Sequence, residues 1–183
     1  MIIIINGPSG SGKTTLGDYF KELGLKEIVS TTTRAPREGE VDGESYHFVS
    51  QEEFLKSHRI EESFYSGNYY GVTKEEVEEK VKDGQSAFAS LDINGVKSFK
   101  KIFGDEVMVI YIKVSRTTLK KRMSKRGDTV DNIRKRLEFH KTTREDLNDQ
   151  YADHIIYNHD SITKLKKQGR RILEQAGIIK PEK

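Results

Sequence analysis

Short apolar runs alternate with amphipathic and charged segments along the chain, and this pattern predicts its strands and helices. Four of residues 1–6 are isoleucine, a β-branched run that is typical of a strand buried on both faces. Further strands are predicted at residues 27–31, 46–49, 86–91, 107–114 and 154–157, with short aromatic-rich strands within 60–71. Helices are predicted at residues 14–23, 73–82, 94–103, 116–125, 131–148 and 161–175, and a capping box of Ser50 and Glu53 opens another.

Strands that alternate with helices in this way predict an α/β fold with a parallel sheet. Ligands of such sheets bind beyond the carboxyl ends of the strands. The length of 183 residues fits one domain with inserted lobes. Charged residues make up 33% of the chain, above the usual ~25%, which favours hydrophilic lobes around a small core or a cleft for a charged ligand.

The chain has no cysteine, which excludes disulfides, thiolate metal sites and cysteine nucleophiles and is compatible with the cytosol. Its longest apolar run, residues 1–5, is far shorter than the roughly 20 residues of a membrane-spanning helix. We therefore expect a cytoplasmic protein without a membrane partner. The five histidines lack the paired spacing of a metal site.

Charge is distributed unevenly. Residues 115–144 contain eleven lysines and arginines but three acidic residues, whereas residues 52–83 contain nine acidic and five basic residues. The net charge of the whole chain is +3, which is too small to indicate a nucleic-acid partner. We therefore expect no nucleic-acid binding.

Residues 7–14 read Gly-Pro-Ser-Gly-Ser-Gly-Lys-Thr and match the phosphate-loop pattern G-x-x-x-x-G-K-[ST] between a predicted strand and a predicted helix. Glycines let the backbone wrap around an anion, and the start of the helix adds partial positive charge. The lysine is expected to bridge the β and γ phosphates, and the threonine hydroxyl to bind Mg²⁺. The predicted ATP-binding residues in this segment are Gly7, Pro8, Ser9, Gly10, Ser11, Gly12, Lys13, Thr14 and Thr15.

A second group of motifs follows the loop. Residues 30–37 read Ser-Thr-Thr-Thr-Arg-Ala-Pro-Arg, residues 43–48 read Gly-Glu-Ser-Tyr-His-Phe, and residues 66–71 read Ser-Gly-Asn-Tyr-Tyr-Gly. The forked guanidinium groups of two closely spaced arginines suit phosphate oxygens. In this order, and together with the phosphate loop, the motifs resemble those of guanylate kinases over nearly the whole chain, more weakly after Asp160.

This resemblance implies a single three-layer P-loop kinase domain with a parallel core sheet, an inserted lobe that binds the nucleoside monophosphate (NMP) and a helical lid. It implies transfer of the γ-phosphoryl group of ATP to GMP and dGMP, with Mg²⁺ as cofactor, by a monomer or homodimer. The implied boundaries are 1–30, 83–114 and 145–183 for the core, 31–82 for the GMP-binding lobe and 115–144 for the lid.

The resemblance also implies the residues that bind GMP. Arg34, Arg37, Tyr46 and Tyr70 resemble a clamp on the GMP phosphate. Ser30 resembles a hydroxyl that recognises the guanine edge. All five are predicted to line one pocket next to the phosphate loop.

Glu61 resembles the carboxylate that accepts hydrogen bonds from guanine N1–H and the 2-amino group. Guanine presents two adjacent donors there, whereas adenine has an acceptor at N1 and no 2-amino group. A buried polar mismatch of this kind discriminates by roughly 10⁴-fold. Glu62 follows immediately, so the register of this assignment stays open by one residue.

Two positions depart from the family pattern. Val72 stands where the family usually has serine or threonine, and Thr73 follows it as an alternative hydroxyl. Asp92 matches an acid near magnesium, with a helix cap as the alternative reading, and Asn94 stands where a second acid would contact the base amino group. Val72, Asp92 and Asn94 are included in the predicted GMP site, with weaker base selectivity expected. Thr14 and, through water, Asp92 are the predicted Mg²⁺ ligands.

The basic segment resembles the family's lid. Arg122, Arg126 and Arg136 align with arginines that reach the triphosphate and the transferred phosphoryl group, and Asn158 resembles a position beside the adenine of ATP. Phosphoryl transfer needs fixed positive charge more than covalent chemistry. The predicted catalytic residues are Lys13, Arg34, Arg122, Arg126 and Arg136.

Three alternatives remain open at this point. A ribose-bisphosphate phosphokinase would share the fold but would not need a guanine-reading carboxylate. A non-catalytic, peptide-binding scaffold would typically have an eroded phosphate loop, whereas this loop is intact. A nucleic-acid-binding protein would show steep salt dependence and no turnover.

Overall fold

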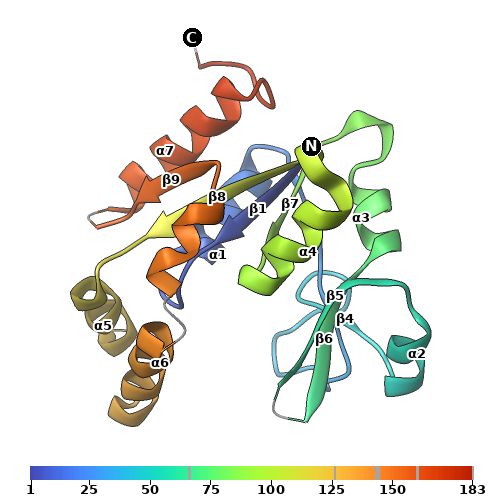
Figure 1. Ribbon diagram of the computed structural model, residues 1–183, viewed down its shortest axis with the longest axis horizontal. Helices are drawn as coiled ribbons and strands as arrows, with labels where there is room; N and C mark the ends of the chain where they lie inside the picture. Colours follow the sequence, from blue (N-terminus) through green and yellow to red (C-terminus); the bar gives the residue numbers. More distant parts are fainter. Residues whose placement is uncertain (66, 126, 143–144, 160, 183) are drawn as a thin grey trace.

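The structure is a computed structural model, and it describes residues 1–65, 67–125, 127–142, 145–159 and 161–182. Within these residues, one sheet forms the core of the molecule (Figure 1). All neighbouring strands of this sheet are parallel. Their order is β2 (Lys26–Glu27), β7 (Ala87–Ser90), β1 (Ile2–Asn6), β8 (Val107–Lys113) and β9 (His154–Tyr157).

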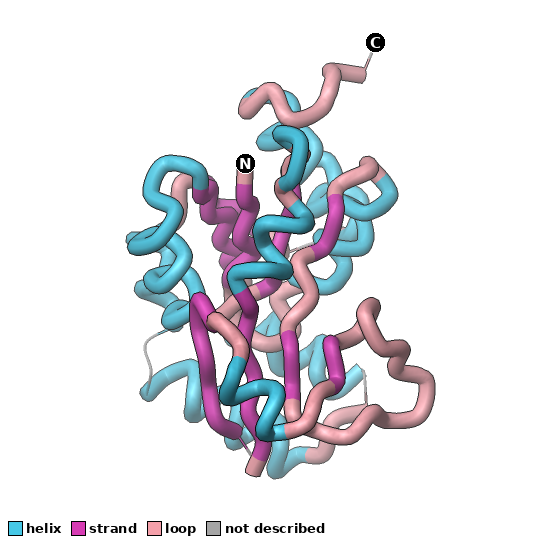
Figure 2. Tube along the Cα trace, turned by 90° about the vertical axis from the view of Figure 1, so that its right-hand side faces the viewer, coloured by secondary structure: helices cyan, strands magenta, loops and turns pink. Residues whose placement is uncertain are grey.

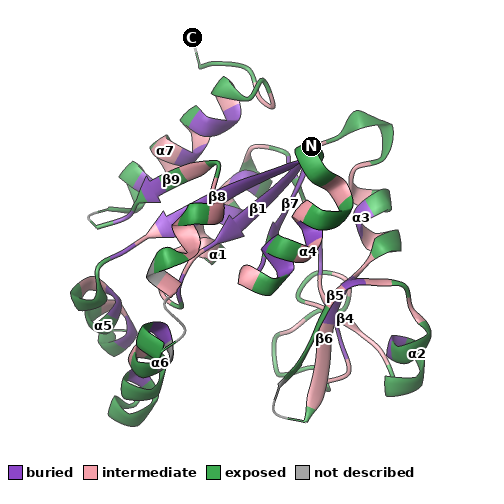
Figure 3. Ribbon diagram, in the orientation of Figure 1, coloured by how far each residue is buried: buried purple, intermediate pink, exposed green. Residues whose placement is uncertain are grey.

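Helices cover both faces of the core sheet. The isoleucines of β1 alternate: Ile3 and Ile5 pack with the face that carries α1 (Lys13–Glu22) and α7 (Ile162–Gln175). Ile2 and Ile4 pack with the opposite face, which carries α4 (Ile93–Phe103). The central strands β7, β1 and β8 are largely buried between the two helical layers, whereas the edge strands β2 and β9 are partly exposed (Figure 3). The predicted three-layer α/β fold is therefore confirmed.

A second, smaller sheet lies apart from the core sheet (Figure 2). Its order is β4 (His47–Phe48), β3 (Thr31–Thr32), β6 (Asn68–Thr73) and β5 (Arg59–Tyr65). Helix α2 (Gln51–Lys56) begins at the predicted capping box of Ser50 and Glu53, which is confirmed. Helix α3 (Lys74–Lys80) begins at Thr73, whose hydroxyl caps it, and a short 3₁₀ turn, Lys82–Gly84, leads back to the core.

Helices α5 (Arg116–Lys125) and α6 (Val130–Thr142) lie together beside the carboxyl end of β8 (Figure 1). Leu119, Met123 and Ile133 bury the inner sides of these helices against the core cluster around Leu16. Their other faces are exposed (Figure 3). The remaining 3₁₀ segments are Gly104–Glu106, before β8, and Glu145–Tyr151, before β9.

The prediction of one strand at residues 27–31 is wrong. Strand β2 ends at Glu27, and β3 begins at Thr31 in the other sheet. The amide of Val29, between them, donates to the side chain of Glu76 at 2.9 Å rather than to a neighbouring strand. The chain leaves the core sheet at this point.

The prediction of one helix at residues 131–148 is also wrong, because α6 ends at Thr142. The 3₁₀ segment Glu145–Tyr151 is bound to β8 instead. The Tyr111 hydroxyl donates to the Glu145 carbonyl oxygen at 2.7 Å, and Lys113 Nζ lies 2.5 Å from Asp149 Oδ2. These tertiary contacts compete with continuation of the helix. Across the described residues, every helix is too short or too polar to cross a membrane.

Close packing of the small sheet generates a first prediction. Gly71 faces Glu62 across the β5–β6 pair, and a Cβ atom added to Gly71 would lie 2.5 Å from the Glu61 carbonyl oxygen. The backbone would have to move, so we expect Gly71→Ala to lower the free energy of unfolding by about 1–3 kcal/mol. Urea titration measures this change. Ser63→Ala, at an exposed position of the same hairpin, is the control and should change stability by less than about 0.5 kcal/mol. Equal stability of the two variants would contradict the close approach.

Candidate active site

The phosphate loop joins the carboxyl end of β1 to the start of α1. Gly7, Gly10 and Gly12 have φ angles of 147°, 83° and 107°, which favour glycine over residues with a Cβ atom. Gly12 is the N-cap of α1 and supplies no side-chain hydrogen bond, so the first amides of this helix are available to an anion. The loop is therefore shaped as an anion site.

Lys13 folds over the loop from which it starts. Its Nζ donates to the carbonyl oxygens of Gly7 at 2.6 Å and Pro8 at 3.2 Å. Burial lowers the pKa of Lys13, and the negative charge of Glu145 partly opposes this shift. The ammonium group is thus held at the loop by neutral oxygen atoms, which a phosphate group can replace.

Arg122 and Asn158 lie against the same loop. Arg122 Nη2 donates to the Asn158 carbonyl oxygen at 3.0 Å and to its Oδ1 at 3.1 Å, and Nη1 donates to Ser11 O at 3.3 Å. Asn158 Nδ2 donates to Ser11 O at 2.7 Å. Burial lowers the pKa of the Arg122 guanidinium. Arg122 and Asn158, with Thr14 and Thr15, line a cavity of about 510 Å³.

An arginine of α6 also reaches the loop. Arg136 Nη1 donates to Ser9 Oγ at 2.7 Å and lies 3.7 Å from Asp128 Oδ2. Arg126, which was predicted beside them, lies outside the described residues. The structure therefore brings Arg122 and Arg136 to the phosphate loop from α5 and α6.

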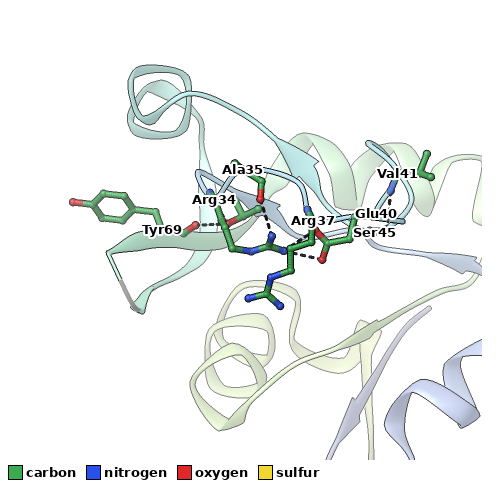
Figure 4. Close-up of polar contacts among 8 residues, drawn as sticks. Arg34, Ala35, Arg37, Glu40, Val41, Ser45 and Tyr69 are labelled. Carbon is green, nitrogen blue, oxygen red and sulfur yellow. Dashed lines mark hydrogen bonds and ion pairs between the residues drawn. The ribbon is translucent and has the colours of Figure 1, made fainter.

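Arg34, in the loop after β3, is held by a carboxylate. Its Nη2 donates to Glu40 Oε1 at 2.8 Å and Oε2 at 3.0 Å, and its Nη1 donates to Ala35 O at 2.7 Å (Figure 4). The Arg37 amide donates to the same carboxylate at 2.8 Å, while its side chain extends into solvent. These bonds hold the pKa of Glu40 below its usual range. Glu40 occupies the guanidinium fork that a phosphate would use.

Two tyrosines complete this cluster. The rings of Tyr46 and Tyr70 lie 6.0 Å apart in an edge arrangement, and Arg34 Cζ lies 5.5 Å from the Tyr46 ring centre. Ser30 is half-buried, and its carbonyl oxygen accepts from the His47 amide at 2.9 Å. Arg34, Tyr46 and Tyr70 thus lie together, although they come from three separate segments of the chain. The side chain of Arg37 does not join them.

The geometry favours Glu61 over Glu62 as the base-reading carboxylate. Glu62 is exposed and accepts from Arg59 Nε at 2.6 Å. Glu61 has no hydrogen-bond donor on its carboxylate among the described residues. Burial first, and then the charges of Asp92 and Glu62, raise the pKa of Glu61 to about 7.

The remaining residues predicted for the GMP site differ in their exposure. Asp92 is exposed and caps α4, its Oδ1 accepting from the amides of Asn94 at 2.9 Å and Gly95 at 3.0 Å. Asp92 and Asn94 share a cavity of about 650 Å³ with Lys13. Val72, in contrast, is 0% exposed in the core, so its side chain has no surface to offer to a base.

Two acidic residues near the site are absent from the sequence-based predictions. Glu40 follows Arg37 by three positions, a spacing that could have indicated its pairing with the arginine loop. Glu145 lines the cavity that contains Lys13 and Asp92, and its Oε2 lies 3.0 Å from Nδ1 of buried His140. No local motif marks Glu145, because only the tertiary fold brings it to the loop.

A metal ion would depend on few protein ligands here. The described residues contain no group of three or more His, Cys, Asp or Glu that could hold one. Thr14 at the start of α1 and Asp92 are both exposed and offer hard oxygen atoms. Mg²⁺ typically takes one or two such ligands and keeps several waters, so the oxygen chemistry of each of these side chains suits this ion.

A phosphate loop on a parallel core sheet, with basic helices on one side and an arginine–tyrosine cluster in a separate small sheet, defines a P-loop nucleotide kinase. The family model described as "Guanylate kinase" matches residues 1–176. The chain belongs to the guanylate kinase family.

Individual relatives agree. The chain is 37% identical over 169 residues to a guanylate kinase of Wolinella succinogenes, covering 87% of this chain and 77% of the relative. It is 40% identical over 143 residues to a guanylate kinase of Helicobacter pylori (strain ATCC 700392 / 26695), covering 74% and 69%. The crystal structure of guanylate kinase from Anaplasma phagocytophilum is similar, with a TM-score of 0.70 and 26% identity over 98% of this chain and 87% of that one.

The raised pKa of Glu61 generates a second prediction. Below about pH 4 the carboxyl is protonated in both folded and unfolded chains, and it costs no stability. Between the ordinary pKa of 4.5 and the folded value of about 7, the unfolded chain loses its proton first, so stability falls as pH rises. We expect Glu61→Gln to raise the free energy of unfolding by about 2–3 kcal/mol above pH 7 and to leave it unchanged at pH 4. Denaturant unfolding from pH 4 to 8 measures this difference, and a gain that does not vary with pH would contradict the assignment.

Proposed function

We propose that this chain is an ATP:GMP phosphotransferase that transfers the γ-phosphoryl group of ATP to GMP, giving ADP and GDP, and that dGMP is a second acceptor. The observation that carries this proposal is the half-buried Glu61 carboxylate, which lacks a donor among the described residues. Guanine supplies two adjacent donors, N1–H and the 2-amino group, that match its two oxygens. Family membership and the intact phosphate loop support the same reaction.

In this proposal ATP binds the phosphate loop and the cavity beside it. The loop amides and Lys13 hold the β and γ phosphates, and Arg122 with Asn158 borders the remainder of the nucleotide. The ATP-binding set is the one predicted from the sequence, Gly7 to Thr15 and Asn158. Thr14 and, through water, Asp92 would hold Mg²⁺, which supplies charge neutralisation for the phosphate oxygens when bound.

GMP binds the small sheet. Arg34, Arg37, Tyr46 and Tyr70 hold its phosphate, and Glu40 must release the Arg34 fork when that phosphate arrives. Ser30 and Glu61 read the base edge. Asp92 and Asn94 border the shared cavity, while burial removes Val72 from the set. In this division residues 31–82 form the GMP-binding lobe, residues 115–144 the lid, and the rest the core.

The reaction needs position and fixed charge more than a general base, since the attacking GMP phosphate is already anionic. Lys13, Arg34, Arg122 and Arg136 would surround the transferred group, whose transition state spreads negative charge over its equatorial oxygens. Arg126 belongs to this set by family resemblance. Like charges on the lid repel one another until nucleotide arrives, so closure over ATP is driven by the ligand and excludes water.

The proposed reaction generates a third prediction. A coupled assay of ATP consumption should show turnover with GMP and dGMP and far less with AMP, UMP or ribose bisphosphate. Lys13→Ala should reduce kcat by at least about 10²-fold, because it removes fixed charge at the transferred group, while the circular dichroism spectrum stays unchanged. Turnover with ribose bisphosphate instead of GMP would overturn the proposed function, as would peptide binding without turnover.

A fourth prediction concerns base selectivity. Glu61→Ala removes the two acceptors for guanine and leaves neutral space next to the base, so kcat/KM for GMP should fall by about 10²-fold or more while that for AMP changes little. The ratio of the two values in parallel assays measures the effect. Equal use of GMP and AMP by the unmutated enzyme would overturn the base-reading role.

A further inference from the structure

Glu76 is an enclosed carboxylate that the proposed reaction does not use. It lies in the first turn of α3, directly after β6, and its side chain is only 9% exposed. The Thr73 hydroxyl accepts from its amide at 3.2 Å and thereby fixes the start of the helix. A carboxylate in this environment requires donors.

Donors reach Glu76 from three elements. The Val29 amide donates to Oε1 at 2.9 Å, from the segment between the two sheets. His47 Nε2, in β4, lies 3.0 Å from Oε2, so an ionised Glu76 requires the hydrogen of this imidazole to be on Nε2. Lys80 Nζ, one turn along α3, lies 3.4 Å from Oε1. The carboxylate therefore joins the entry segment, β4 and α3.

These partners adjoin residues of the proposed GMP site. Val29 immediately precedes Ser30, and His47 immediately follows Tyr46. The His47 amide also donates to the Ser30 carbonyl oxygen at 2.9 Å, so the two segments are joined through their backbones as well. Glu76 thus links the segment that contains Ser30 to the segment that contains Tyr46.

We propose, on the basis of the proposed function, that Glu76 is a positioning residue for GMP. Its two oxygens hold the Val29–Ser30 and Tyr46–His47 segments at the spacing that the bound nucleotide requires. It touches neither nucleotide. Its loss lets the two segments separate and weakens GMP binding, while the phosphate loop that binds ATP is unaffected.

The same helix provides a matched control. Glu75 Oε1 lies 3.0 Å from His58 Nδ1, the same kind of contact at the same distance. These side chains are 61% and 85% exposed, and neither residue adjoins a proposed nucleotide contact. Exposed pairs of this kind contribute little. Glu75→Ala therefore removes a glutamate–histidine pair from α3 without disturbing the proposed site.

The test compares Glu76→Ala, Glu76→Gln, His47→Ala and Glu75→Ala in steady-state assays, with Tm measured for each variant. Glu76→Ala should raise the KM for GMP about tenfold, with kcat and the KM for ATP within about twofold of the unmutated enzyme, because uniform binding of one substrate is lost. Glu76→Gln should restore most of the affinity, since its amide oxygen can still accept from Val29. Glu75→Ala should leave both KM values unchanged.

His47→Ala tests the same contact from its other side if the Glu76→Ala variant does not fold. It removes a side chain that is partly exposed and should raise the KM for GMP about threefold. A purely structural role would lower Tm and leave the ratio of the two KM values unchanged, and that result would overturn the proposal. An unmutated enzyme that does not phosphorylate GMP would instead overturn the proposed function itself.

Discussion

Three of the cationic side chains that we propose to bind phosphate are paired with oxygen atoms of the protein itself. Lys13 donates to carbonyl oxygens of its own loop, Arg122 to that loop and Asn158, and Arg34 to the Glu40 carboxylate. A buried charge without such partners would be costly. These contacts also hold the side chains near the proposed phosphate positions. When a nucleotide binds, its phosphate oxygens replace these protein acceptors. Because the cationic side chains are already ordered, binding costs little of their conformational entropy.

The exchange differs between the two proposed subsites. Glu40 carries a full negative charge, so a GMP phosphate that binds Arg34 replaces one anion with another. The gain in electrostatic free energy at Arg34 is only the difference between these two interactions. Lys13 and Arg122 are paired with neutral oxygens, and burial lowers the pKa of each. Glu145 compensates the charge of Lys13 only in part, so an arriving triphosphate adds charge compensation at this loop. The electrostatic gain is larger at the phosphate loop than at the small sheet.

Local pattern was enough to predict most of the fold. The isoleucine run of β1, the capping box at Ser50 and the boundaries of α5 and β9 follow from residues close together in the sequence. Residues 27–31 and 131–148 were predicted wrongly because distant partners decide them. The Val29 amide donates to the Glu76 side chain instead of to a neighbouring strand. The segment after α6 accepts a hydrogen bond from Tyr111 of β8.

The same distinction applies to the candidate site. The phosphate loop is a contiguous motif, so the sequence alone identifies it. The arginine–tyrosine cluster was predicted through resemblance to a family, and the structure brings Arg34, Tyr46 and Tyr70 together. Glu76 and Glu145 were missed because their partners are distant in the sequence or are reached only through the tertiary fold.

Three glutamates that are at least partly buried differ in the hydrogen-bond donors that reach their carboxylates. Glu76 is bonded by an amide, an imidazole and an ammonium group, and Glu145 is paired with His140, so each is satisfied within the fold. Glu61 has no donor among the described residues, and its pKa is raised to about 7, which means that the folded chain gives up stability to keep it ionised. A carboxylate satisfied by the fold serves structure or position. Glu61, which lacks such donors, is the carboxylate that we propose to bind a ligand, and the two adjacent donors of guanine would match its two oxygens.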